Sequence, residues 1–176
     1  MLPYIIITIV FIIGLFIVLL IADNDKLKEK YIKIKAANES IGSLLKKKLE
    51  LCNKIVKYID EKNDNDICKD VKISNAKELN SFELNEKLNN LYSKILEIVE
   101  YNKEVILDDD ENKKVAKLKD LSLELLGAQK YYNENAESLN KLVGKIPYNL
   151  VSKFKGYKRV KLYENEKKEI FEILKK

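Results

Sequence analysis

One stretch of this sequence constrains the fold more than any other. Residues 2–22 read LPYIIITIVFIIGLFIVLLIA and contain no charged side chain. As an α-helix with a rise of about 1.5 Å per residue, these 21 residues extend about 32 Å. The hydrocarbon core of a bilayer is about 30 Å thick. The sequence therefore predicts a transmembrane anchor at residues 1–22, which makes the lipid bilayer the first expected partner.

A cleaved signal peptide is the other interpretation of such a run. Signal peptides combine a basic start, an apolar segment of roughly 7–15 residues and a cleavage site with small residues. Here neither Lys nor Arg precedes the run, the run is longer, and the chain leaves it as Leu20-Ile21-Ala22-Asp23. The sequence favours an anchor that is not cleaved.

The charges beside the run predict the orientation of the anchor. The short N-terminal tail has no basic residue, whereas five lysines follow the run: Lys26, Lys28, Lys30, Lys33 and Lys35. Positive charge beside a span stays in the cytoplasm. We therefore expect a single-pass protein of the cell membrane, with its N-terminus outside and its C-terminal body in the cytoplasm. The same lysines suit contact with anionic headgroups or a solvated helix face, and the sequence favours neither.

The residues that are missing narrow the chemistry. The chain has no His, which excludes His-based acid–base catalysis and imidazole metal sites. Cys52 and Cys68 lack a metal-binding spacing, and Arg159 is the only arginine in a chain with a net charge of +5. Nucleic-acid readers usually use several arginines. We expect no enzyme activity and no catalytic residue, metal, cofactor or nucleic-acid partner.

The body of the chain has the pattern of packed helices. Apolar residues recur at alternating steps of three and four in three stretches, 27–59, 84–105 and 118–146. The first series is Leu27, Tyr31, Ile34, Asn38, Ile41, Leu45, Lys48, Cys52, Ile55 and Ile59. We take the connections between these stretches to be short loops. Neighbouring helices joined by short loops should be antiparallel. The first helix would leave the membrane, the second return and the third leave again.

The predicted fold class is all-α, with an N-terminal transmembrane helix followed by an elongated antiparallel helical bundle. Three long helices and a short C-terminal helix, within residues 163–176, make up this fold. The predicted divisions are the transmembrane anchor at 1–22, the bundle at 23–155 and a basic tail with a short amphipathic helix at 156–176. The acids of Asp108–Glu111 lie near the start of the third long helix, so they should cap its free N–H groups. A calcium loop is not expected, because these acids lack its spacing.

Three asparagines interrupt the apolar series: Asn38, Asn102 and Asn135. A polar residue at such a position can fix the register of packed helices at a cost in stability. The hypothesis is that at least two of the three are buried and hydrogen-bonded across helices. In the alternative, all three lie at the edge of the helix contact and touch water.

The stretch after Pro147 alternates basic and aromatic residues. The candidate contacts for a protein partner are Phe154, Lys155, Tyr157, Lys158 and Arg159, which suit an acidic or phosphate-bearing surface. In the alternative interpretation, Phe154 and Tyr157 pack on the end of the bundle while the lysines stay in water. The predicted topology starts this tail far from the membrane, so contact with the bilayer is not expected unless the tail folds back.

Several short motifs in the second half of the chain match a known family. They are Tyr132-Asn133, Leu139-Asn140, Ile146-Pro147-Tyr148-Asn149-Leu150, Gly156-Tyr157-Lys158 and Tyr163-Glu164. In order and spacing they resemble the C-terminal signature of LemA-family bacterial membrane proteins, and residues 41–56 are similar more weakly. Gln129, Leu139 and Tyr148 stand where the family has Arg, Tyr and Gly, which puts any arginine-dependent family interaction in doubt.

The resemblance implies a bacterial, membrane-anchored helical bundle of a family without an established enzymatic activity. Some relatives take part in building intracellular membrane compartments, which suggests a scaffold or adaptor that binds an unknown protein, with homo-oligomerisation as a compatible addition. The alternative is a small-ligand binder or enzyme that uses carboxylate and tyrosine side chains inside the bundle. Its expected lining is Tyr92, Tyr101, Tyr131 and Tyr132.

Overall fold

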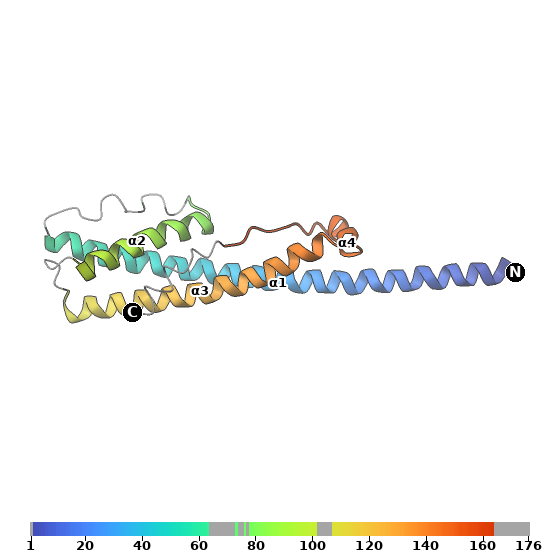
Figure 1. The fold of residues 1–176 in the computed structure, drawn as a ribbon, viewed down its shortest axis with the longest axis horizontal. Helices are drawn as coiled ribbons and strands as arrows, with labels where there is room; N and C mark the ends of the chain where they lie inside the picture. Colours follow the sequence, from blue (N-terminus) through green and yellow to red (C-terminus); the bar gives the residue numbers. More distant parts are fainter. Residues whose placement is uncertain (1, 64–72, 74–75, 77, 102–106, 164–176) are drawn as a thin grey trace. The chain divides into compact units, whose positions relative to one another are not determined.

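The computed structural model describes residues 2–63, 73, 76, 78–101 and 107–163. Within this part of the chain all regular structure is α-helical, and four helices follow one another (Figure 1). They are α1 (Leu2–Asn63), α2 (Ser81–Tyr101), α3 (Asp109–Val143) and α4 (Tyr148–Lys155). The predicted all-α helical bundle is confirmed. The short helix predicted within residues 163–176 lies outside the described residues.

The apolar run forms the first part of α1, which continues without interruption into the body. Every side chain from Pro3 to Leu19 is exposed. Such a continuous apolar surface is unfavourable in water and suits a lipid environment. Among the described residues, α1 is the helix whose length and composition are compatible with a single membrane span.

The chain divides into two compact units, and α1 and α3 contribute to both. The first unit contains Met1–Asn38 and Lys130–Tyr163, which bring together the start of α1, the end of α3, and α4 with the segment after it. The described residues of the second unit lie within Glu39–Gln129, where the rest of α1 and α3 pack with α2. The boundaries between the two units lie inside α1 and α3. The divisions predicted from the sequence, in contrast, lie where the amino-acid composition changes.

The apolar heptad positions form the core of the second unit. Buried side chains from all three helices meet there, and they belong to the three series read from the sequence: Ile41, Leu45, Cys52, Ile55, Ile59, Leu84, Leu88, Leu91, Ile95, Ile98, Leu118, Leu121 and Leu125. Removing such side chains from water is the main favourable term in folding. The predicted core of this unit is confirmed.

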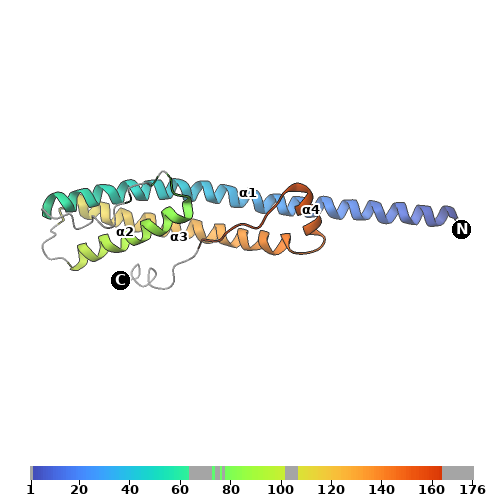
Figure 2. The same ribbon diagram turned by 90° about the horizontal axis from the view of Figure 1, so that it is seen from above.

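The direction of α2 corrects the predicted topology. Lys48 and Asn89 pair across α1 and α2, and one pocket is lined both by residues of 42–50 and by residues of 76–84, so the two helices run in the same direction (Figures 1 and 2). Asn85, near the start of α2, contacts Gln129 of α3, so α3 is antiparallel to α2. The predicted return of the second helix is therefore wrong.

The length of the connection explains the difference. Residues 64–80 separate α1 from α2. Seventeen residues can span about 56 Å when extended, whereas α2 is only about 32 Å long. Antiparallel neighbours are required only when the connection is short.

The start of α3 carries the predicted cap. Asp108 Oδ1 accepts hydrogen bonds from the backbone N–H groups of Asp110 (3.1 Å) and Glu111 (2.9 Å). These bonds favour the ionised form and hold the pKa of Asp108 below its usual value. Asn80 and Glu83 form the equivalent capping box at the start of α2, where each side chain accepts a backbone N–H of the other residue.

Candidate membrane-proximal interaction surface

A segment without regular structure, residues 157–163, is held to the end of α3 by two asparagines. Asn133 donates to the carbonyl of Tyr163 and accepts its N–H, both at 2.8 Å. Asn140 makes the same pair of bonds with Val160, at 2.9 and 2.8 Å. Each amide thus satisfies both backbone groups of one residue, as a neighbouring strand would.

Two tyrosines complete this attachment. The hydroxyl of Tyr132 donates to the carbonyl of Lys161 at 3.0 Å, and its ring packs edge-to-face against Tyr163, with 5.0 Å between the ring centroids. The hydroxyl of Tyr163 in turn donates to Asn38 on α1 at 3.2 Å. The segment is therefore tied to both long helices of the first unit.

The short helix α4 lies beside the part of α1 where the apolar run ends (Figures 1 and 2). The chain reaches it through a cis peptide bond between Ile146 and Pro147, and it ends at Gly156, whose left-handed φ of 77° suits a residue without a side chain. Val151 and Ser152 are its buried residues.

A groove of about 390 Å³ separates α4 from α1. Its lining is mostly apolar and comprises Phe16, Ile17, Leu20, Ile21 and Asn24 of α1 with Leu150, Val151, Phe154 and Lys155 of α4. The predicted position of the tail, far from the membrane, is therefore wrong. Within the first unit, α4 instead lies beside residues 16–24 of α1, where the apolar run ends.

Aromatic contacts fix both ends of this region to α1. Lys26 Nζ donates to the hydroxyl of Tyr148 at 3.4 Å and lies 6.0 Å from the centre of its ring. Tyr157 packs edge-to-face against Tyr31, with 5.8 Å between the ring centroids. These contacts place α4 between two anchoring points on the same helix.

The five candidate partner contacts have different surroundings. Phe154 is 89% exposed, and Lys155, Lys158 and Arg159 are also exposed. Tyr157 is half-buried and packs on Tyr31 of α1, whereas the side chain of Phe154 is exposed. The segment therefore presents an exposed aromatic ring and three exposed cations.

The three asparagines of the apolar series also differ. Asn135 is buried, accepts a hydrogen bond from Lys30 of α1 at 3.4 Å and donates to the carbonyl of Tyr131. Asn38 is exposed, and its side chain accepts a hydrogen bond from Tyr163 of the C-terminal segment. Asn102 lies outside the described residues. The role of these residues in fixing register stays a prediction.

A buried lysine marks the core of the second unit. Lys48 is 1% exposed, and its Nζ donates to Asn89 at 3.0 Å and lies 4.9 Å from the centre of the Tyr92 ring. Burial lowers the pKa of Lys48 to about 8 and raises the pKa values of Cys52 and Tyr92 to about 12. Sequence reasoning did not single out Lys48, although a charged residue inside an apolar series was a visible signal.

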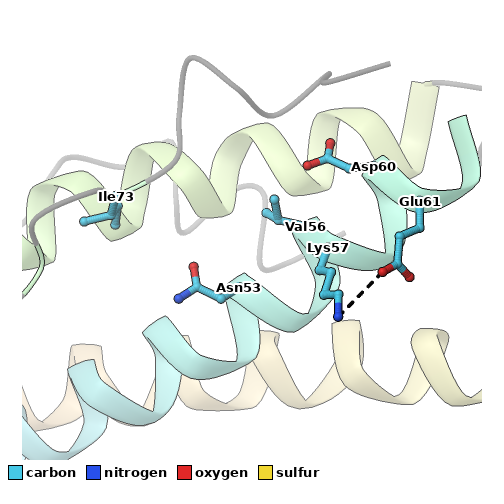
Figure 3. Close-up of a pocket in the computed structure, with 6 residues that line it drawn as sticks. All are labelled: Asn53, Val56, Lys57, Asp60, Glu61 and Ile73. Carbon is cyan, nitrogen blue, oxygen red and sulfur yellow. Dashed lines mark ion pairs between the residues drawn. The ribbon is translucent and has the colours of Figure 1, made fainter. Parts of the chain in front are cut away.

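The tyrosines expected to line a ligand site do not meet in one cavity of the described structure. Tyr92 and Tyr132 are buried in different units, Tyr131 is exposed, and the side chain of Tyr101 lies outside the described residues. A pocket of about 560 Å³ in the second unit has another lining: Asn53, Val56, Lys57, Asp60, Glu61 and Ile73 (Figure 3). There Lys57 is paired with Glu61 at 3.6 Å.

Comparisons with protein-family models, with curated proteins and with solved structures found no match to this chain.

Proposed function

We propose that this protein is a membrane-anchored, non-enzymatic helical scaffold of the LemA type, which presents its bundle to protein partners at the cytoplasmic face of the membrane. One observation carries the proposal: the apolar run and the packed body share one helix. The run ends at Ala22, and Leu27 of the same helix is already fully buried. An anchor joined in this way holds the first unit directly at the membrane surface.

The network around the C-terminal segment supports a structural role for the residues that resemble the LemA motifs. Tyr132, Asn133, Asn140 and Tyr163 are among the residues on which the resemblance rests, and they form the hydrogen bonds between α3 and the returning segment. Residues that hold backbone in place fit a structural role better than a catalytic one. The motif is thus compatible with a family that has no established reaction.

The lysines after the span support a cytoplasmic body. The five basic residues between Lys26 and Lys35 follow the apolar run directly, whereas the residues before the run are uncharged. In intact cells, a protease added outside should therefore leave the bundle uncleaved, and permeabilised cells should lose it. Cleavage of the bundle in intact cells would contradict this orientation.

Lys158 and Arg159 are the proposed contacts with a protein partner. Both are exposed, and Asn140 holds the neighbouring backbone at Val160. A fixed, basic segment suits an acidic protein surface.

Crosslinking of the full chain in native membranes tests this function. Replacing Lys158 and Arg159 with Glu should remove the main crosslinked partner, because the charge of the contact is reversed. The matched control replaces Lys113 and Lys117, two exposed lysines of α3, with Glu and should keep it. If both double variants give the same crosslinked proteins as the wild type, or if the full chain is found in the aqueous fraction, the proposal fails.

A further inference from the structure

We propose that α4 is an interfacial helix, which inserts its exposed apolar side chains into the leaflet that α1 leaves and binds anionic phospholipid through its flanking lysines. The proposal rests on the membrane span of the proposed function. It assigns to Phe154 and Lys155 a contact with lipid, where the sequence alone suggested a protein partner.

The depth of α4 relative to the span is the first argument. The groove beside α4 is lined by Phe16, Ile17, Leu20 and Ile21, and the apolar run ends at Ala22. With a rise of about 1.5 Å per residue, these side chains lie within about 9 Å of the end of the run. Amphipathic helices that lie in a membrane interface are buried to about 5–10 Å. The position of α4 therefore coincides with the boundary between headgroups and acyl chains.

The exposure of the apolar side chains is the second argument. Phe154 is 89% exposed, Ile146 is 80% exposed and Leu150 is 39% exposed. Leu150 and Phe154 are four residues apart in α4, so they share one face, and both line the groove. Covering large exposed apolar side chains with lipid removes their surface from water, which is favourable in free energy.

Charge is the third argument. Residues 144–163 contain five lysines and Arg159 and not one acidic residue. Lys153 and Lys155 belong to α4 itself and are exposed. Long basic side chains can reach the headgroups while their aliphatic stems cover apolar surface. Such cations are attracted to the negative surface potential of an anionic leaflet.

The lining of the groove favours lipid over a soluble protein as its occupant. One wall belongs to the predicted span, whose side chains are exposed from Pro3 to Leu19 and would face acyl chains in a bilayer. A soluble protein that entered the groove would have to displace lipid from Phe16 and Leu20. An acyl chain of an anionic phospholipid fills the same apolar space and leaves its headgroup beside Lys155.

Fluorescence quenching in vesicles tests the proposal on the full chain. The native cysteines are replaced by Ala, and a polarity-sensitive fluorophore is attached at Phe154→Cys, at Ile12→Cys or at Leu123→Cys. Ile12 lies in the middle of the span, and Leu123 is an exposed apolar residue of α3 in the second unit. The vesicles contain phosphatidylglycerol and phosphatidylcholine, of which part is brominated in the upper acyl chain.

We expect the label at position 154 to be blue-shifted and quenched by the brominated lipid, and the label at position 123 to be neither. Replacing Lys153 and Lys155 with Glu should weaken the quenching at position 154.

If the label at position 12 is protected from water and the label at 154 behaves like that at 123, the inference fails while the span stands. If the label at 12 is also exposed to water, the span itself fails. Protection of position 154 in native membranes but not in pure lipid vesicles would identify a protein occupant and overturn the assignment to lipid.

Discussion

The two units of this molecule are stabilised in different ways. In the second unit, apolar side chains of three helices form the core, and Lys48 is buried within it. In the first unit, the amides of Asn133 and Asn140 hold a segment that has no secondary structure of its own. The first unit also leaves large apolar side chains such as Phe154 exposed, whereas the second places almost all of its heptad positions inside.

The first unit therefore adds a few specific polar contacts to an apolar core of its own, in which Leu27 and Leu139 are 0% exposed. Burial of apolar area is spread over many side chains, and each contributes in proportion to its size. A segment held by two amides depends on a few specific groups, because a backbone N–H or C=O that is left without a partner costs free energy. The C-terminal segment of the first unit should therefore be sensitive to substitution of these two asparagines, whereas the loss of one apolar side chain in the second unit should lower stability in proportion to the area that it buries.

The largest expected effect is on the core of the second unit. Leu88 of α2 is 0% exposed, so Leu88→Ala should lower the free energy of unfolding by about 3 kcal/mol through lost burial and the cavity left behind. Urea unfolding of the full chain in detergent, followed by circular dichroism, measures this change. Leu123→Ala is the matched control, because Leu123 is 45% exposed and should change the free energy by less than about 0.5 kcal/mol. Equal effects of the two variants would contradict the assignment of the core.

A smaller effect is expected at the amide contacts of the first unit. Asn133→Ala removes the two hydrogen bonds between the side chain of Asn133 and the backbone of Tyr163, which should lower the free energy of unfolding by about 2 kcal/mol. Limited proteolysis should then cleave the chain within residues 157–163 faster than in the wild type. The Asn133→Asp variant should be cleaved almost as fast as Asn133→Ala. A carboxylate can accept a hydrogen bond from the Tyr163 N–H, but it repels the Tyr163 carbonyl.

Asn90→Ala is the control for this substitution, since Asn90 is an exposed residue of α2. It should leave the rate of cleavage in residues 157–163 unchanged. If Asn133→Ala is cleaved no faster than Asn90→Ala, the contrast between the two units is lost, since the C-terminal segment would then not depend on its amides.

The parts of the fold that follow from local rules were predictable from the sequence. The apolar run, the unbroken α1, the heptad positions of the second unit and the cap at Asp108 each follow from the spacing or the chemistry of neighbouring residues. The direction of α2 does not, because the residues between α1 and α2 are numerous enough to allow either direction. That one choice reverses α3 and places α4 at the opposite end from the one predicted.

The candidate surface was only partly predictable for the same reason. The sequence marks Phe154, Lys155, Lys158 and Arg159 as candidates by composition, but the nearness of Phe154 and Lys155 to residues 16–24 depends on the topology. The double hydrogen bonds of Asn133 and Asn140 join residues 20 to 30 positions apart. No period of three, four or two residues reports such a contact, so the asparagines appear in the sequence only as part of a motif.

The smallest expected effect concerns the charge buried in the second unit. Lys48 has a folded-state pKa of about 8, below its ordinary value of 10.5, so the unfolded chain binds more protons between these values. Stability should therefore rise with pH from about 8 upward. Cys52 has a folded-state pKa of about 12, above its ordinary value of 9.0, so it lowers the stability of the folded chain as the pH rises above 9.0. Tyr92 also has a folded-state pKa of about 12 and lowers the stability above its ordinary value of 10.0. The net rise between pH 7 and pH 9 should be about 1 kcal/mol, followed by a fall at higher pH.

Substitutions separate these opposing contributions. Lys48→Met keeps most of the apolar volume and removes the titrating group, so the rise between pH 7 and pH 9 should disappear. Cys52→Ala should instead extend the rise toward pH 10, because the opposing thiol is gone. Lys47→Met alters the exposed neighbour of Lys48 and should keep the wild-type profile. Urea unfolding at a series of pH values measures all four proteins, and a rise that survives in Lys48→Met would mean that this lysine is not the source of the pH dependence. Because Asn133 and Asn140 do not titrate, cleavage within residues 157–163 should not follow this profile, and a parallel pH dependence would remove the distinction between the two units.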